Sequence, residues 1–315
     1  MYRDLNTYLR EQFGGKVYKL ALSGGMGCPN RDPVTGKGGC IFCSAGGSGE
    51  FAPSALLPIP RQLELAKGRL AGKYKGHAYI AYFQSYTNTY APVPYLEHIF
   101  SQTLKDPEVV ALSIGTRPDC LEKEVLSLLE RLRRRRPVWV ELGLQTANEE
   151  IARQINRGYE LPCFEKSVQA LKAIGAVVVV HVILGLPNET KTSMIETVEY
   201  LNQIGIDGIK LQLLHVLKGT ELEKRYSNGA FRILELPEYV DILAECIEHL
   251  SPSTVVHRLT GDGPKQLLIA PLWSADKKRV WNAIQLEFAR RPVLQGRLAG
   301  KECSYDPHLA AEAFD

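Results

Sequence analysis

Short apolar runs alternate with longer amphipathic segments along most of this chain. The run VVALSI (109–114) shows no polar alternation, which is typical of a strand covered on both faces. Segments such as PVPYLEHIFSQTL (92–104) instead repeat apolar residues at helical spacing. The pattern predicts strands at 17–22, 77–83, 109–114, 137–144, 176–186 and 207–216, and helices at 59–71, 92–104, 117–132, 147–157, 162–174, 190–205 and 236–250.

This order predicts an α/β fold of about six β-then-α units, which gives a parallel sheet with right-handed crossovers. Six units are fewer than the eight of a complete barrel. We therefore expect an open (β/α)6 partial TIM barrel over residues 1–250, with a short C-terminal extension, residues 251–315, packed on the barrel. A doubly wound open sheet is the alternative. In the helix at 117–132, Asp119 is the expected N-cap, with Glu122 completing a capping box.

The composition is that of an ordinary globular protein, with 315 residues, 45% hydrophobic, 23% charged and a net charge of +3. This small charge does not by itself indicate a nucleic-acid or membrane partner. No apolar run is long enough for a membrane span, and the first residues are too charged for a signal peptide. Seven cysteines without an export signal favour reduced thiols, so we expect a cytoplasmic protein with no membrane partner.

Three of the cysteines, Cys28, Cys40 and Cys43, lie in the loop-like stretch GCPNRDPVTGKGGCIFC (27–43) directly after the first predicted strand. Independent core thiols are disfavoured because the flanking Gly, Pro and Lys offer nothing apolar to bury them. A redox pair would not need Cys28. Structural zinc would need a fourth ligand, and His77 is already inside a strand. A [4Fe–4S] cluster held by three cysteines leaves one iron open. Spacing alone leaves zinc and the cluster open.

The wider pattern resembles the radical S-adenosylmethionine (SAM) superfamily, since three cysteines with Phe42 inside the last pair follow the first strand of a (β/α)6 pattern. SIGTRPD (113–119), ELGLQT (141–146) and INRG (155–158) look like the branch shared by the elongator catalytic subunit and oxygen-independent coproporphyrinogen oxidase. Further motifs are similar to bacterial YhcC/YtqA-type proteins along nearly the whole chain: QSYTNTYAP (84–92), HVILGLP (181–187) and LHVLKGTELE (214–223).

The resemblance implies a [4Fe–4S] cluster on Cys28, Cys40 and Cys43, with SAM on the open iron, and it assigns no catalytic side chain. Relatives carry a Glu where this chain has Gly115, so Ser113 and Glu141 are the replacement candidates. The residues expected to bind SAM are Phe42, Thr87, Ser113, Glu141, Gln145, Arg157, Gly185, Leu214 and Val216. The residues expected to face the substrate are Gln84, Tyr86, Asn88 and His215.

The implied reaction is reductive cleavage of SAM to a 5′-deoxyadenosyl radical, with an electron donor of the flavodoxin or ferredoxin type. Kinship with the elongator subunit implies tRNA modification at the wobble uridine, with RLRRRR (131–136) and the basic stretch 277–291 as phosphate contacts. The alternatives are a small metabolite or tetrapyrrole substrate, or a non-catalytic, metal-stapled RNA-binding protein. The enzyme is favoured by the presence of Gln145, Arg157 and Gly185, because a structural zinc site needs none of these residues.

Overall fold

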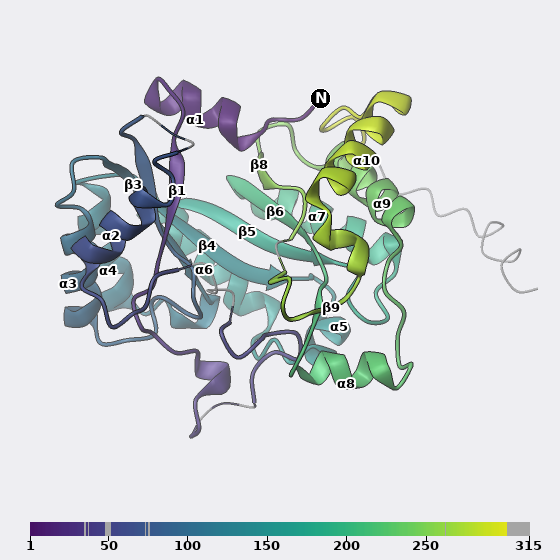
Figure 1. Ribbon diagram of the computed structural model, residues 1–315, viewed down its shortest axis with the longest axis horizontal. Coiled ribbons are helices and arrows are strands. Elements are labelled where there is room, and N and C mark those ends of the chain that lie inside the picture. The colour runs from purple at the N-terminus through teal and green to yellow at the C-terminus, as the bar shows by residue number, and fades with distance from the viewer. Residues whose placement is uncertain are drawn as a thin grey trace, which may run out of the picture.

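A parallel sheet of seven strands curls into an open barrel in the computed structural model, and helices cover its outer side (Figure 1). The structure describes residues 1–34, 36, 38–47, 52–72, 74, 76–261 and 263–300. Within them the strand order is β1-β2-β3-β4-β5-β6-β8, and every neighbouring pair is parallel. This arrangement confirms the predicted α/β partial TIM barrel.

The strands are β1 Tyr18–Leu22, β2 Tyr79–Phe83, β3 Val109–Thr116, β4 Val138–Gln145, β5 Val177–Leu184, β6 Gly208–Leu213, β7 Val216–Leu217, β8 Val255–Arg258 and β9 Leu268–Ala270. The α-helices are α1 Leu5–Phe13, α2 Ile59–Gly68, α3 Val93–Thr103, α4 Lys123–Arg133, α5 Glu149–Gln154, α6 Leu161–Ala173, α7 Lys191–Ile204, α8 Glu221–Ser227, α9 Leu236–His249 and α10 Lys277–Arg290. Short 3-10 helices are η1 Pro29–Arg31, η2 Pro118–Cys120 and η3 Leu272–Ala275.

The largest apolar core lies between the sheet and its helices. Leu112 and Val180 from the strands share it with Leu128 of α4, Phe164 of α6 and Val198 of α7, and all five are at most 1% exposed. Burial of these helix faces supplies the main stabilisation of the barrel. The opposite side of the strands faces the barrel interior, because successive side chains in a strand point to opposite faces.

The helix ends follow local sequence signals. Helix α7 begins after Thr190, whose side chain accepts a hydrogen bond from the Ser193 backbone N–H at 3.1 Å. It ends at Gly205, which adopts a left-handed conformation with φ 74°. Helix α4 differs from expectation, because it begins at Lys123 and its N-cap is Glu122. The prediction that Asp119 is the N-cap of this helix is wrong.

The seventh strand of the sheet, β8, was not among the six that the sequence predicted. It contains four residues, VVHR, of which half are polar, so the apolar signal of a buried strand is weak. It pairs with β6, and α9 forms the crossover between them. The boundary at residue 250 stays a prediction, but β8 joins the segment beyond it to the same sheet.

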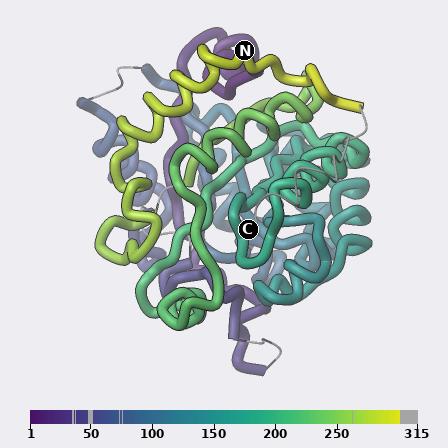
Figure 2. The backbone as a smooth tube through the Cα atoms, turned by 90° about the vertical axis from the view of Figure 1, so that its right-hand side faces the viewer, coloured from purple at the N-terminus to yellow at the C-terminus, as the bar shows by residue number. Residues whose placement is uncertain are grey.

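The two ends of the described chain lie side by side, as Figure 2 shows for the purple and yellow segments. The Met1 amino group donates to the carbonyl of Val293, and the Gln295 backbone N–H donates to the Met1 carbonyl at 3.1 Å. Helix α10 packs on α9 through the buried side chains of Val280 and Ile284. Among the described residues, no helix is both long enough and apolar enough to span a membrane.

Candidate active site

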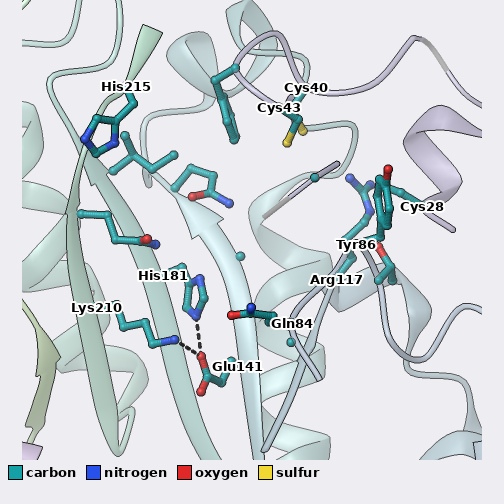
Figure 3. Close-up of a pocket in the computed structure, with 18 of the residues that line it drawn as sticks. Cys28, Cys40, Cys43, Gln84, Tyr86, Arg117, Glu141, His181, Lys210 and His215 are labelled. Atoms are coloured by element: carbon teal, nitrogen blue, oxygen red, sulfur yellow. Dashed lines mark hydrogen bonds and ion pairs between the residues drawn. The ribbon is translucent and has the colours of Figure 1, made fainter. Parts of the chain in front are cut away.

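A cavity of about 310 Å³ opens at the carboxyl ends of the strands, where ligands of parallel α/β folds bind. The loop after β1 supplies Cys28, Cys40 and Cys43 to its wall, and most other wall residues lie on strands β2 to β8 or in the segments that follow them. Figure 3 shows the cysteines and His215 at one end of this cavity and Glu141, His181 and Lys210 at the other. The size suits one small molecule or the reacting part of a larger one.

The cysteine loop, defined as residues 27–47 that the structure describes, is held by hydrogen bonds to the turn after α5. Asn30 donates from its side chain to the Asn156 carbonyl at 2.6 Å, and Asn156 donates in return to the Gly39 carbonyl at 2.6 Å. Gly158 has φ +83°, and a Cβ there would lie 2.9 Å from the Asn30 Oδ1. The sequence INRG therefore supports the cysteine loop directly.

Apolar and charged contacts complete this support. Ile41 is 6% exposed and packs in a small core with Ile155 and Leu222, while its backbone bonds to both. The Arg31 guanidinium donates to the carbonyls of Cys43 and Ser44 at 2.7 Å each. These contacts fix the backbone on both sides of Cys40 and Cys43.

The donor chemistry of the three cysteines fits an iron–sulfur cluster. All three are half-buried thiols on the pocket wall, and Figure 3 shows the Cys40 and Cys43 sulfurs side by side. A hydrogen bond from Cys43, helped by Arg117 and the Asn30 amide, lowers the pKa of Cys40 to about 7. In the described part of the chain, no three His, Cys, Asp or Glu side chains converge to hold one ion. A cluster does not require such convergence, because each thiolate binds its own iron.

Most of the residues predicted to bind SAM or substrate line this pocket. Tyr86 has φ 58°, and its hydroxyl donates to the Ala45 carbonyl, so its ring lies against the cysteine loop. The Thr87 backbone N–H donates to the Gly27 carbonyl at 3.0 Å. The predicted residues on the wall are Phe42, Gln84, Tyr86, Thr87, Glu141, Gln145, Arg157, Leu214 and His215.

Four predicted residues are not part of the described pocket wall. The Ser113 hydroxyl donates to Glu141 at 2.7 Å, and the Asn88 side chain donates to the Gly115 carbonyl at 2.8 Å. Val216 is buried in β7, opposite β9. Gly185 has φ +84°, and a Cβ there would lie 2.7 Å from the Leu234 side chain, so backbone geometry and packing explain this glycine.

Arg157 and Gln145 are held by their own surroundings. The Arg157 guanidinium is 2% exposed, donates to the carbonyls of Thr146 and Tyr159 at 2.8 and 2.9 Å, and pairs with Glu149 at 3.0 Å. Gln145 has φ 73° at the end of β4 and folds back over Gly143, where a Cβ would lie 2.8 Å from its amide nitrogen. Both line the pocket, but Arg157 has most of its donors occupied.

Arg117 is a wall residue that the sequence analysis quoted only inside a motif. It donates to Asp119 through two nitrogens at 2.9 and 2.7 Å, which explains why Asp119 does not cap α4. A third nitrogen donates to the Arg157 carbonyl at 2.8 Å. Its guanidinium thus joins the end of β3 to the INRG turn beside the cysteines.

A polar layer crosses the barrel interior below the cysteines; we define it as Lys19, Ser113, Glu141, His181 and Lys210. Glu141 is at its centre and its side chain has no exposure to solvent. One carboxylate oxygen accepts from Lys19 and Ser113 at 2.7 Å each, and the other accepts from His181 at 2.7 Å and from Lys210. Every member of the layer comes from a different strand.

The charges in this layer are coupled. Burial alone would raise the pKa of Glu141, but Lys19, Lys210 and His181 hold it well below its usual range. Burial lowers the pKa of His181 to about 4 and that of Lys210 to about 7, although Glu141 opposes both changes. Glu141 is therefore a carboxylate and His181 is a neutral imidazole at neutral pH.

Lys19, His181 and Lys210 were missed by the sequence analysis, although a signal was present. Each is a titratable residue inside a short apolar run, as in YKLAL, VVVVHVIL and GIKLQL. A charged side chain inside a strand that is otherwise buried on both faces needs a partner in the interior. The pattern therefore indicates a polar cluster inside the barrel, but it does not indicate which side chains bond to one another.

Two family models match most of the sequence. Residues 23–201 match one described as the Radical SAM superfamily, and residues 206–290 match one described as the Radical_SAM C-terminal domain. The second match includes β8 and α10. Together they cover the barrel from the loop after β1 onward and most of the segment expected as an extension.

Individual relatives agree with these matches. The "Uncharacterized protein YtqA" of Bacillus subtilis is 45% identical over 94% of this chain and 92% of its own length. "Protein YhcC" of Escherichia coli is 38% identical over 85% of this chain and 86% of its own length. The solved structure of Methanocaldococcus infernus Elp3, with an N-terminal deletion, is 16% identical with a TM-score of 0.70, covering 89% of this chain and 64% of that one. At that identity the likeness shows the fold.

Proposed function

Because the chain belongs to the radical SAM superfamily and is a radical SAM enzyme, we propose that Cys28, Cys40 and Cys43 hold a [4Fe–4S] cluster at which SAM is cleaved. The observation that supports this most is the meeting of the three cysteines on one pocket wall, on a loop braced from both sides. When bound and reduced, the cluster supplies the electron that splits SAM into methionine and a 5′-deoxyadenosyl radical, which abstracts hydrogen from the substrate.

The protein's own residues bind and orient SAM in this proposal. Phe42 and Leu214 offer apolar surface for the adenine, and Gln145 and Thr87 offer polar groups on the same wall. Arg117 and Arg157 line the pocket with the cysteines and pair with Asp119 and Glu149, so the carboxylate of SAM would share these guanidinium groups with them. The apolar core beneath the loop, which includes Ile41, would help to exclude water from the reacting end.

We further propose that the substrate is a nucleoside of tRNA, as the elongator resemblance implies. A cavity of about 310 Å³ cannot take a folded RNA, so one nucleotide would have to leave its stack and enter. Lys218 and Lys265 are exposed beside Leu217 and Pro264, which line the pocket, so they offer phosphate contacts near the opening.

The two basic stretches named from the sequence are less suited to this contact. Arg133, at the end of α4, donates to the carbonyl of Gly175, just before β5 begins, so the stretch 131–136 lies at the amino ends of the strands. That end is opposite the cysteines. The stretch 277–291 forms α10, which packs on the outer side of α9. Lys218 and Lys265 are therefore our preferred RNA contacts.

Two measurements test this proposal, one for the reaction and one for the substrate. Protein reconstituted without oxygen, then given dithionite and SAM, should release 5′-deoxyadenosine. Mass spectrometry of tRNA from a strain lacking the protein should show one modified nucleoside missing, which the reconstituted protein restores. If the tRNA of both strains is identical while 5′-deoxyadenosine still forms, the substrate is a small metabolite or tetrapyrrole.

The RNA contacts have a matched control within the chain. Changing Lys218 and Lys265 together to Ala should make the log–log salt dependence of tRNA binding shallower by up to about two units, at about 0.7–0.9 per contact. Changing Arg134, Arg135 and Arg136 to Ala removes more charge from the far end of the barrel and should leave the slope unchanged. Equal effects from both variants would mean non-specific attraction and would contradict the proposed docking site.

A further inference from the structure

Two amines of the polar layer share one carboxylate, and burial lowers the pKa of one of them, Lys210, to about 7. Glu141 is the layer's one carboxylate among the described members, and it is shared by the ammonium groups of Lys19 and Lys210. His181 adds no charge because its pKa is lowered to about 4 by burial. Arg258, the register neighbour of Lys210 on β8, is an exposed cation that lines the same pocket. An anion bound at this end of the pocket would supply a counter-charge that favours the charged form of Lys210.

Lys210 is placed to meet such a counter-charge. Its side chain is 6% exposed, yet the residue lines the pocket, and Figure 3 shows it beside His181 and Glu141 in the interior. An ammonium group has three donors. Among contacts to described residues, Glu141 takes one donor and the Tyr82 hydroxyl, at 3.2 Å, receives a second. One donor remains for a ligand in the cavity.

The depth of Lys210 separates it from the cysteine end. Lys210 is the third residue of β6, and Leu214, on the upper wall, follows four residues later. At about 3.3 Å per residue, the two positions differ by about 13 Å along the strand direction. A group bound at Lys210 therefore lies well below the cysteines, on the inner side of any molecule held next to them.

We propose that this inner end of the pocket binds an anionic oxygen group of the substrate, a carboxylate or a phosphate, with Lys210 as its direct ligand and Arg258 adding positive charge. The proposal rests on the proposed function, because it assigns the inner end of the same pocket to the substrate. The low pKa of Lys210 supports it, since a bound anion would favour the charged ammonium and offset the cost of burial. The substrate would then be an acid, with its anionic end inward and its reacting carbon toward the cysteines.

Calorimetric titration of reconstituted full-length protein tests this proposal. SAM at saturating concentration and no reductant keep the outer end occupied and uncleaved, and the probes are methyl phosphate and acetate at constant ionic strength. We expect one equivalent of one probe to bind. Preference for methyl phosphate would identify a phosphate group, and preference for acetate a carboxylate.

The variant Lys210→Gln should weaken this binding about tenfold or more, the effect expected for losing a charged hydrogen bond. Lys166→Gln, an exposed lysine on α6, should leave it unchanged. If thermal unfolding shows that Lys210→Gln does not fold, Arg258→Gln carries the test and should weaken binding at least about threefold through the lost charge. Binding of neither probe, or equal binding by wild type and a folded variant, would overturn the proposal.

Failure of this proposal can be distinguished from failure of the proposed function. SAM cleavage by the wild type, measured as 5′-deoxyadenosine, tests the cluster and SAM without any anion. If cleavage is absent while the probe binds through Lys210, the anion site stands and the proposed reaction falls. If cleavage proceeds and neither probe binds, the reaction stands and the anion site falls.

Discussion

The cysteine loop and the polar layer face the same pocket but are built in opposite ways. The loop is one stretch of sequence whose position is fixed mainly by backbone carbonyls, through Asn30, Arg31 and Asn156. In the polar layer, β1, β3, β5 and β6 each supply one side chain. All four side chains bond to the carboxylate of Glu141 on β4. The cysteine loop is a local motif, so shifts of the segments that hold it can move it. The polar layer exists only when the whole sheet has formed.

The cysteine loop and the polar layer therefore have different tasks. Loop thiolates can shift slightly to accept a metal cluster, and their supports are mostly hydrogen bonds to backbone carbonyls. The layer is rigid, because Glu141 is buried and bonded on both oxygens. Changes in the loop should therefore affect metal content more than stability, and changes in the layer should affect stability more than metal content.

The largest expected effect is on metal content. Cys40→Ala should reduce the iron of the reconstituted protein from about four atoms per chain to near zero, because the cluster loses one of its three protein ligands. The control is Cys246→Ala, in the buried face of α9, which should retain the iron. Iron and sulfide analysis measures both, and full iron in the Cys40 variant would contradict the assignment of the loop.

The next effect is on stability. Glu141→Gln should lower the free energy of unfolding by about 3–5 kcal/mol, because it leaves the half-buried Lys19 and the buried Lys210 without their shared carboxylate. Glu64→Gln, whose side chain is 68% exposed, should change it by less than about 0.5 kcal/mol. Urea unfolding followed by circular dichroism compares them. Equal stability of the two variants would mean that the layer is not the rigid element of the barrel.

A smaller and pH-dependent effect is expected at Glu189, an acid outside both regions. Burial raises the pKa of Glu189 to about 7, and its Oε2 atom is buried without a hydrogen-bond partner among the described residues. The unfolded chain then ionises near pH 4.5 while the folded one keeps its proton until about pH 7, so folding stability falls as the pH rises through this window.

Glu189→Gln should remove this dependence. We expect little change at pH 5 and a gain of roughly 1–3 kcal/mol at pH 8, measured by urea unfolding at each pH. Glu150→Gln, an exposed acid on α5, is the matched control and should show no such difference between the two pH values. A gain of the same size at pH 5 and pH 8 would show that ionisation of Glu189 is not its cause.

Sequence patterns predicted the barrel because its strands are nearly continuous apolar runs and its helices have clear apolar faces. They did not predict β8, since VVHR is short and half polar and is recognised as a strand only next to β6. The helix start at Lys123 was also missed, because Asp119 pairs with Arg117 instead of capping. In both cases a tertiary contact decided the local structure.

The site divides in the same way. The position of Cys28, Cys40 and Cys43 on one pocket wall could be predicted, because they lie in one short loop directly after a strand. The partners of Glu141 were not, because Lys19 is 122 positions away in sequence and Lys210 is 69 away. Their meeting depends on strand order and register, which a single sequence does not specify.

The most direct test of the central claim is the yield of 5′-deoxyadenosine from reconstituted wild type and from Cys43→Ala, each given SAM and dithionite under the same anaerobic conditions. Chromatography with mass spectrometry counts the product per chain. The cysteine loop as described predicts equal amounts of 5′-deoxyadenosine and methionine from the wild type and none from the variant. No product from a wild type that carries four irons, or equal product from both proteins, would contradict the account.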